Sequence, residues 1–489
     1  MNKEIKSFKI NLGYVGLFTA FAITISLTVI SIMLLFRQRN IGILLLSIGY
    51  FSNLIMFAFI MRNPRTNNNI KGSWMAIFLL VPLGASVAFI MSGWTPWYIR
   101  KTYSKAKVLE SDLFNSEGNG VVASASNSSI EVISNGIDKY NSILKDIETA
   151  KEEINILYFI LHDGFFFNEL FDLLQKKAKE GVVVRVATDY VGSVSTKNKV
   201  FKKLRESGII INQYNVAIMP FTTGFSNNRN HNKLALIDGK VAYFGGMNIG
   251  DEYVNLTTKY GYWEDLHFRA TGLLVNTINK QFILEWFRTT GEDLSNIIKT
   301  DQAKPVTNNS KTTMLMDGPH YDQTTFKTTL IERINNATES IKIQTPYTTI
   351  PFQIEEALSN AVNRGVVVDL ITTGLADKKL AFNNGRYYTE RLNDIGVNVF
   401  RTKDVFMHSK SYVFDGSEAI IGTSNLDFRS IYQHSETNFI VECKTLLAQL
   451  DDNFNRTLSI SYKDIKSSNQ RSMFRSIGWL WHKFISPIL

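Results

Sequence analysis

Three long apolar runs without a charged residue lie near the start of the chain. They cover residues 10–36, 41–61 and 73–99. A helix of about 20 apolar residues crosses the hydrocarbon core of a bilayer, so each run is long enough to span it. A cleaved signal peptide has a shorter apolar core and a small-residue cleavage site, and three runs in succession argue against buried core helices. The pattern therefore predicts a membrane region, residues 1–107, with about three transmembrane helices.

The basic residues beside these runs do not orient them. With three spans, six lysines and arginines fall on each side of the membrane. The positive-inside rule needs an excess of basic residues on one side, so charge alone leaves the orientation open.

A different apolar pattern closes the chain. Residues 463–489 combine apolar side chains at helical spacing with basic residues such as Arg471, Arg475 and Lys483. A helix of this kind can lie in the headgroup plane of a membrane or pack on a protein domain. We therefore predict an amphipathic C-terminal segment and leave both placements open.

Between these ends the chain repeats one pattern. LLQKKAKEGVVVRVATD (173–189) resembles ALSNAVNRGVVVDLITT (357–373). Each stretch predicts an amphipathic helix, a glycine stop and a continuous apolar strand. Continuous apolar strands that alternate with helices are typical of a sheet covered on both faces. The repeat therefore predicts an α/β fold made of two duplicated domains.

Polar stretches set the expected boundaries of these domains. Residues 108–129 are rich in Ser, Asn and Gly, and residues 301–312 are polar, so both are predicted to be linkers. The two domains are then expected at 130–300 and 313–462.

A triplet of histidine, lysine and aspartate recurs in both halves. The two histidines are 177 residues apart, and each triplet follows the same helix–glycine–strand unit. One such triplet would be weak evidence, but two at matching positions in a repeat are hard to assign to chance. The triplets are His231, Lys233 and Asp238 in the first half and His408, Lys410 and Asp415 in the second.

The spacing of the triplets suits phosphodiester chemistry. Residues two apart on a strand point to the same face, so each histidine projects with its lysine. Asn248 and Asn425 end the strands that follow. If the halves pack about a pseudo-twofold axis, lysines and amides bind non-bridging oxygens, one imidazole attacks phosphorus and the other transfers protons. The set contains no metal-ligand cluster, and we expect no metal or cofactor.

Four carboxylates are candidates for holding this arrangement. A nucleophilic imidazole needs an acceptor on its second nitrogen. Asp265 and Glu436 lie at comparable distances after their histidines in matching strands, so we expect them to orient the imidazoles. Asp238 and Asp415 belong to the repeated motif and count among the candidate catalytic residues. Both sit in a turn, where aspartate commonly bonds local backbone, so a structural role is favoured for them.

These residues resemble the phospholipase D superfamily, whose signature is the paired His-Lys-Asp motif, and they are most similar to bacterial cardiolipin synthases. The likeness runs from about residue 50 onward and includes YWEDLHFRATG and IQTPYTTIP. It implies two phospholipase D-like α/β/α sandwich domains packed about a pseudo-twofold axis, on the cytoplasmic side of the cell membrane.

The resemblance also implies a reaction. Two phosphatidylglycerol molecules give cardiolipin and glycerol through a phosphatidyl–enzyme intermediate. By this likeness His231 is the nucleophile and His408 is the acid and base. The residues that cradle the phosphate would be Lys233, Lys410, Asn248 and Asn425.

Three alternatives stay open. A phospholipase D that releases phosphatidic acid to water would use the same residues, so the sequence does not separate transfer from hydrolysis. A nuclease suits the net charge of +9, but the apolar runs and the lack of a dense Lys/Arg stripe in the soluble part argue against nucleic acid. An inactive lipid-binding scaffold is disfavoured because both triplets are intact.

The single cysteine, Cys443, excludes an internal disulfide framework, and the sequence does not indicate an oligomeric state.

Overall fold

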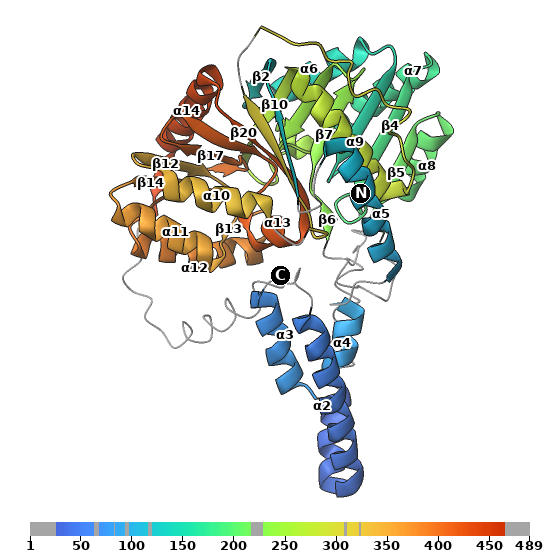
Figure 1. Ribbon diagram of the computed structural model, residues 1–489, viewed down its shortest axis with the longest axis vertical. Helices are drawn as coiled ribbons and strands as arrows, with labels where there is room; N and C mark the ends of the chain where they lie inside the picture. Colours follow the sequence, from blue (N-terminus) through green and yellow to red (C-terminus); the bar gives the residue numbers. More distant parts are fainter. Residues whose placement is uncertain are drawn as a thin grey trace, which may run out of the picture. The chain divides into compact units, whose positions relative to one another are not determined.

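The computed structural model divides the chain into two compact units (Figure 1). The first contains the apolar helices that precede Thr102, and the second contains Thr102–Tyr214 and Arg229–Gly478. The residues that the structure describes are 26–62, 68–82, 84–92, 97–115, 120–216, 228–307, 311–321 and 324–464.

One sheet of the second unit belongs to the first half of the repeat. Its order is β2-β10-β8-β7-β3-β4-β5, with β3, β4 and β5 parallel and the other neighbours antiparallel. Helices connect the parallel strands, as parallel pairing requires. The strands are β2 (Ser128–Ile133), β3 (Glu153–Tyr158), β4 (Val183–Asp189), β5 (Ile210–Tyr214), β7 (Lys233–Ile237), β8 (Val241–Gly245) and β10 (His267–Gly272), and the helices are α6 (Gly136–Glu148), α7 (Phe165–Lys179), α8 (Asn198–Glu206) and α9 (Leu273–Thr290).

The other sheet repeats this order in the second half. The series β11-β20-β18-β17-β12-β14-β15 matches the first sheet strand for strand, and β1 and β21 extend its two edges. The predicted duplication is therefore confirmed at the level of strand order. The strands are β1 (Val121–Ala125), β11 (Thr312–Asp317), β12 (Ser340–Gln344), β14 (Val367–Thr372), β15 (Asn398–Thr402), β17 (Ser411–Phe414), β18 (Glu418–Gly422), β20 (His434–Val441) and β21 (Ser461–Lys463), and the helices are α10 (Thr325–Asn336), α11 (Phe352–Asn363), α12 (Lys379–Asp394), α13 (Phe428–Tyr432) and α14 (Lys444–Ser459).

The glycine stops of the repeat have a local cause. Gly181 follows α7 and Gly365 follows α11, and each adopts a φ of 91°. Side chains disfavour this left-handed region, so glycine ends each helix and turns the chain into the next strand. The matching geometry explains why the same sequence pattern produces β4 and β14.

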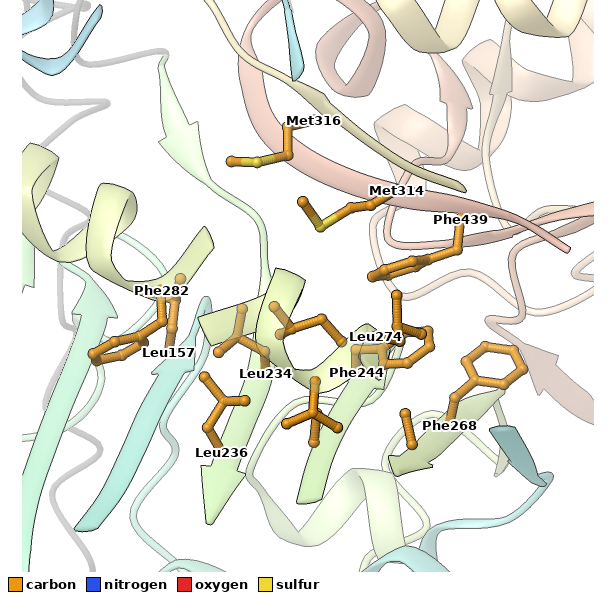
Figure 2. Close-up of a cluster of buried hydrophobic side chains, with 14 of the residues drawn as sticks. Leu157, Leu234, Leu236, Phe244, Phe268, Leu274, Phe282, Met314, Met316 and Phe439 are labelled. Atoms are coloured by element: carbon orange, nitrogen blue, oxygen red, sulfur yellow. The ribbon is translucent and has the colours of Figure 1, made fainter. Parts of the chain in front are cut away.

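The two sheets share one hydrophobic core (Figure 2). Phe244 of β8 and Phe439 of β20 have ring centroids 4.2 Å apart, and Phe268 of β10 stacks on Phe244. Met314 and Met316 of β11 belong to the same buried cluster. An aromatic contact of this kind stabilises by about 0.5–1.5 kcal/mol beyond the burial of its area. This shared core holds the two halves of the second unit together.

The expected linker at 108–129 takes part in the fold. Helix α5 (Trp97–Phe114) covers its start, and β1 pairs with β11 of the second half. The chain therefore crosses from one half to the other before the first sheet begins at β2. Of the second expected linker, 301–312, residues 308–310 lie outside the described part of the chain.

The first unit contains one described helix that is long and apolar enough to cross a membrane. This helix, α2 (Arg39–Met61), has a mean hydropathy of 2.1 and agrees with the predicted run 41–61. Of the run 10–36, the part from Ser26 is helical as far as Arg37, and residues 10–25 lie outside the described residues. The amphipathic segment 463–489 lies almost wholly outside them as well, since the description ends at residue 464.

The run 73–99 is not one helix, contrary to the prediction. It contains most of α3 (Asn68–Leu80), all of α4 (Ala85–Ser92) and the start of α5. Between α3 and α4 lies Pro82, which has no backbone N–H and cannot continue a helical hydrogen-bond ladder. Among the described residues, α2 is therefore the one helix with the length and hydropathy of a membrane span.

Candidate functional site

His231 and His408 each follow a very short strand that pairs with the opposite half. Strand β6 (Arg229–Asn230) lies beside the start of β20, and the His231 N–H donates to the Ser435 carbonyl at 2.9 Å. Strand β16 (Val405–Met407) lies beside β9 (Tyr262–Glu264), and the His408 N–H donates to the Glu264 carbonyl at 2.7 Å. Backbone of the opposite half therefore fixes each histidine.

The carboxylates that orient the imidazoles are exchanged between the halves. His231 Nδ1 lies 3.0 Å from Glu436 Oε2, and His408 Nδ1 lies 2.6 Å from Asp265 Oδ2. Both carboxylates are fully buried. If each Nδ1–H donates to its carboxylate, each Nε2 keeps a free lone pair. The sequence predicted that these two carboxylates lie beside the imidazoles, and in the structure each one contacts the histidine of the other half.

The two lysines are buried beside the imidazoles. Lys233 Nζ donates to the His231 carbonyl at 2.5 Å, and Lys410 Nζ donates to the His408 carbonyl and lies 2.7 Å from His408 Nδ1. Burial lowers the pKa of Lys233 to about 7 and that of Lys410 to about 8, although Glu436 and Asp265 oppose the shift. Both ammonium groups therefore titrate close to neutral pH.

Burial also lowers the pKa of both imidazoles. The pKa of His408 falls to about 4 because burial and the charge of Lys410 outweigh the attraction of Asp265. The pKa of His231 falls well below its usual value through burial and the charges of Lys233, Lys410 and His408. The histidines and lysines of the two halves thus lie close enough to act on one another, and both imidazoles are neutral at pH 7 in the free protein.

Asp238 and Asp415 do not contact the imidazoles. Asp238 accepts hydrogen bonds from the backbone N–H groups of residues 151–153, just before or at the start of β3. Asp415 accepts them from residues 338–340, at 2.8–2.9 Å. Both aspartates have a positive φ, 50° and 49°, in the turns that follow β7 and β17. The geometry therefore removes them from the candidate catalytic set and supports the structural role that the turn favoured.

Asp415→Ala is expected to lower the free energy of unfolding by about 1–3 kcal/mol, because three backbone N–H groups lose a charged acceptor. Alanine also disfavours the positive φ. Thermal unfolding of the detergent-solubilised protein measures the change. Asp415→Asn, which tolerates the turn, should lose less stability. A loss of turnover in a fully folded Asp415→Ala protein would contradict this interpretation.

The two asparagines that were predicted to bind phosphate have part of their amides already engaged by neighbouring residues. Asn248 accepts a hydrogen bond from the Ile160 N–H at 3.1 Å and donates to the Tyr253 hydroxyl at 3.0 Å. The side chain of Asn425 is buried and bonds to Asp427. Each Nδ2 carries two hydrogens, so one N–H of Asn248 is left for a ligand.

Sequence reasoning missed two rings beside the histidines. His434 packs on His231 with ring centroids 5.2 Å apart, and Trp263 packs on His408 at 5.0 Å. Each ring lies two residues before the carboxylate that orients the same histidine. Since residues two apart on a strand share a face, this spacing was the signal that could have found them.

A buried lysine that the sequence did not single out supports Asn248. Lys139 of α6 donates to the carbonyls of Met247 and Asn248 at 2.7 and 3.1 Å, and it is completely buried. A lone lysine on an amphipathic helix carries no sequence signal for this contact. Its bonds fix the backbone from which the Asn248 amide projects.

One group of side chains among the described residues could hold a metal ion, although the sequence had suggested none. The donor atoms of His231, His434 and Glu436 lie within 4.8 Å of one another. An ion there would compete with the contact between His231 and Glu436. The ammonium groups of Lys233 and Lys410, while charged, oppose a cation at this place. The chemistry of the site therefore fits an anionic ligand better.

Comparisons with known proteins agree with this duplicated arrangement. The family described as "Cardiolipin synthase, PLD-like domain" matches residues 143–263 and 330–458, one segment in each half. The cardiolipin synthase of Oceanobacillus iheyensis is 33% identical over 368 residues, which cover 74% of this chain and 76% of the relative. The major cardiolipin synthase ClsA of Bacillus subtilis is 29% identical over 481 residues, covering 92% of this chain and all of the relative.

A solved structure shares the fold. The phosphatidylserine synthase of Haemophilus influenzae superposes with a TM-score of 0.58 at 15% sequence identity. The match covers 79% of this chain and all of that one. At this identity the likeness concerns the two-domain architecture alone.

Proposed function

Since the chain belongs to the family of the cardiolipin synthase PLD-like domain, we propose that it transfers a phosphatidyl group between two phosphatidylglycerol molecules, giving cardiolipin and glycerol. The observation that carries the proposal is the pair of imidazoles, each held by a carboxylate of the other half, with a buried lysine beside each. This arrangement offers a nucleophile, a proton carrier and two cations to one phosphodiester.

The first step forms a covalent intermediate. Nε2 of His231 attacks phosphorus and the bond from phosphorus to the glycerol headgroup oxygen breaks. His408, which takes up a proton when the anionic lipid binds, donates that proton to the departing oxygen. Lys233 and Lys410 balance the charge on the non-bridging oxygens, assisted by the amides of Asn248 and Asn425. The products are free glycerol and a phosphatidyl group on His231.

The second step transfers that group to another lipid. His408, now neutral, accepts the proton from a headgroup hydroxyl of a second phosphatidylglycerol. The hydroxyl oxygen attacks phosphorus and the bond to His231 breaks. Cardiolipin leaves, and both histidines return to their starting protonation states. Water in place of the second lipid would give phosphatidic acid by the same chemistry.

The surroundings of the two rings support this division of roles. Trp263 and Phe406 pack on each other and beside His408, with ring centroids 5.0 and 5.9 Å from that of His408, and aromatic faces favour a cation. His408 also has the shorter contact to its carboxylate. The pKa of His231 is held well below its usual value by burial and by two lysines, which keeps this ring neutral and nucleophilic. The anionic phosphodiester would raise the pKa of His408 on binding and supply the proton carrier.

The test is the product profile of the purified protein with labelled phosphatidylglycerol. The proposal expects cardiolipin and glycerol in equal amounts. Phosphatidic acid as the main product under lipid-rich conditions would favour a hydrolase instead. Salt-dependent binding and cleavage of nucleic acid, without lipid turnover, would favour the nuclease that the sequence left open.

The apparent second-order rate constant kcat/KM is expected to fall as the pH rises from about 7 to 9. Lys233 and Lys410, with pKa values of about 7 and 8, are charged below this range and lose that charge as the pH passes through it. A neutral amine no longer balances the phosphate charge, so binding weakens by up to about tenfold per pH unit. The measurement is a pH profile of initial rates at low substrate. Lys233→Arg, which stays charged, should leave only the part of the alkaline limb that comes from Lys410, and a flat wild-type profile would contradict the prediction.

We also propose that the chain is held in the cell membrane by more than one span, with the catalytic unit on the cytoplasmic side. Helix α2 is 23 residues long, and only 17% of its most apolar stretch is buried within the protein. The run 10–36 is long enough for a further span. Extraction of isolated membranes with sodium carbonate should leave the protein in the pellet, and its release would contradict membrane insertion.

A further inference from the structure

Helices α3 and α4 form a hairpin rather than a continuous span. The ring centroids of Trp74 and Phe89 are 5.1 Å apart, and those of Phe78 and Phe89 are 5.7 Å apart. Trp74 and Phe89 are separated by 15 positions, which would place them about 22 Å apart along one continuous helix. The chain therefore reverses between Leu80 and Ala85 (Figure 1).

The contacts of this hairpin with α2 show how far along α2 its turn lies. At the turn, the hydroxyl of Tyr50 lies 3.4 Å from the Leu79 carbonyl. At the other end, Phe89 of α4 packs on Phe59 with centroids 6.5 Å apart. Tyr50 is the central residue of α2, so it lies about 17 Å from either end. The hydrocarbon core of a bilayer is about 30 Å thick, so the turn lies near its middle when α2 crosses it.

A polar side chain in the middle of α2 explains how the turn can lie at this depth. Asn53 is buried, and its Nδ2 donates to the carbonyls of Phe78, Val81 and Pro82 at 2.8, 3.1 and 3.3 Å. Ser86 at the start of α4 donates to Asn53 Oδ1 at 2.7 Å. Non-helical backbone at membrane depth is tolerated only where protein satisfies its polar groups. Asn53 provides the hydrogen-bond donor for the carbonyls of Phe78, Val81 and Pro82, which lie where the helix is interrupted between α3 and α4.

We propose that residues 68–92 form a re-entrant hairpin that enters one leaflet, turns near the bilayer midplane and leaves on the face where α2 ends. The inference rests on the proposed insertion of α2. The partner is the acyl region of that single leaflet, and the exposed side chains of Leu79, Leu80 and Ile90 contact it. The chain then continues into α5 on the face that also carries Arg62, so α2 and the hairpin together add one crossing, not two.

Site-directed cysteine labelling tests this topology in the full-length protein. Cys443→Ser removes the native thiol, and single cysteines replace Gln38, Arg62 or Lys105, which are all exposed. A membrane-impermeant maleimide is applied to sealed vesicles of each orientation. The hairpin predicts that positions 62 and 105 are labelled from one side and position 38 from the other. Labelling of 62 and 105 from opposite sides would overturn it, because residues 68–92 would then cross the bilayer.

The same experiment separates this inference from its premise. Labelling of positions 38 and 62 from one side would show that α2 itself does not cross, and both proposals would fall. Leu80→Cys reports on depth, because this side chain is 78% exposed in the protein yet would be covered by lipid. It should label at least tenfold more slowly than Arg62→Cys from either side and fully after denaturation in SDS. Labelling as fast as Arg62→Cys would place the turn in water and reject the hairpin.

Discussion

His231→Ala is expected to reduce cardiolipin formation by about 10⁴-fold or more, because a covalent mechanism without its nucleophile retains only binding and charge stabilisation. Thin-layer separation of labelled lipids after incubation with the purified variant measures the loss. His162→Ala is the matched control, since His162 lies outside both triplets, is 36% exposed and bonds to Glu252. Turnover of His231→Ala close to that of the control would reject the covalent role of His231.

The partner variant His408→Ala separates nucleophile from proton carrier. A phosphatidyl ester of p-nitrophenol has a leaving group that needs no proton, so this variant should still transfer the phosphatidyl group to His231 and then stall. Intact-protein mass spectrometry would detect the adduct, and peptide mapping would locate it. General acid–base help is typically worth about 10²–10⁴-fold, which is the expected loss with phosphatidylglycerol itself. An adduct on His408 would reverse the two roles.

Glu436→Gln and Asp265→Asn are expected to fail at different steps, each on the order of 10²–10⁴-fold, because each carboxylate orients one ring. Glu436 contacts His231, so its loss should slow adduct formation even from the activated ester. Asp265 contacts His408, so its loss should permit the adduct from that ester but slow its transfer.

Which of the two variants is slowed in adduct formation shows which carboxylate serves which histidine. Pairing within each half, as sequence proximity suggests, would give the opposite result, with Asp265→Asn slowing adduct formation. Rapid-quench measurements of adduct formation and decay distinguish the two cases. Circular dichroism of each variant provides the control for folding, because both carboxylates are buried and an unfolded protein would show neither step.

Local patterns predicted much of the fold. The glycine stops at Gly181 and Gly365, the apolar strands beside them and the paired triplets all depend on residues close together in sequence, where propensity and spacing carry information. The matching position of Asp265 and Glu436 after their histidines likewise identified both carboxylates. Their exchange between halves depends on β6 and β16, strands of two and three residues that pair over more than 140 positions. So short a strand has no detectable periodicity.

The structure of the apolar run 73–99 could not be predicted from its local sequence pattern. Its composition satisfies the requirements of a span throughout, and a proline alone does not distinguish a kink from a reversal. The deciding contacts are those between Asn53 and the carbonyls around Pro82, which join two segments that the sequence presents as separate. The pairing of β1 with β11 could not be predicted from sequence for the same reason, because nothing near residues 121–125 indicates a partner strand in the other half.

The exchange of carboxylates also bears on how such a chain can evolve. Neither copy of the repeat holds a complete set of groups, so a lone copy can function only as a homodimer that recreates the crossed contacts. Once fused, the copies are free to diverge, as His434 beside one imidazole and Trp263 beside the other illustrate. A mutation in one repeat can therefore disable the histidine of the other repeat, because the carboxylate that contacts this histidine comes from the mutated repeat.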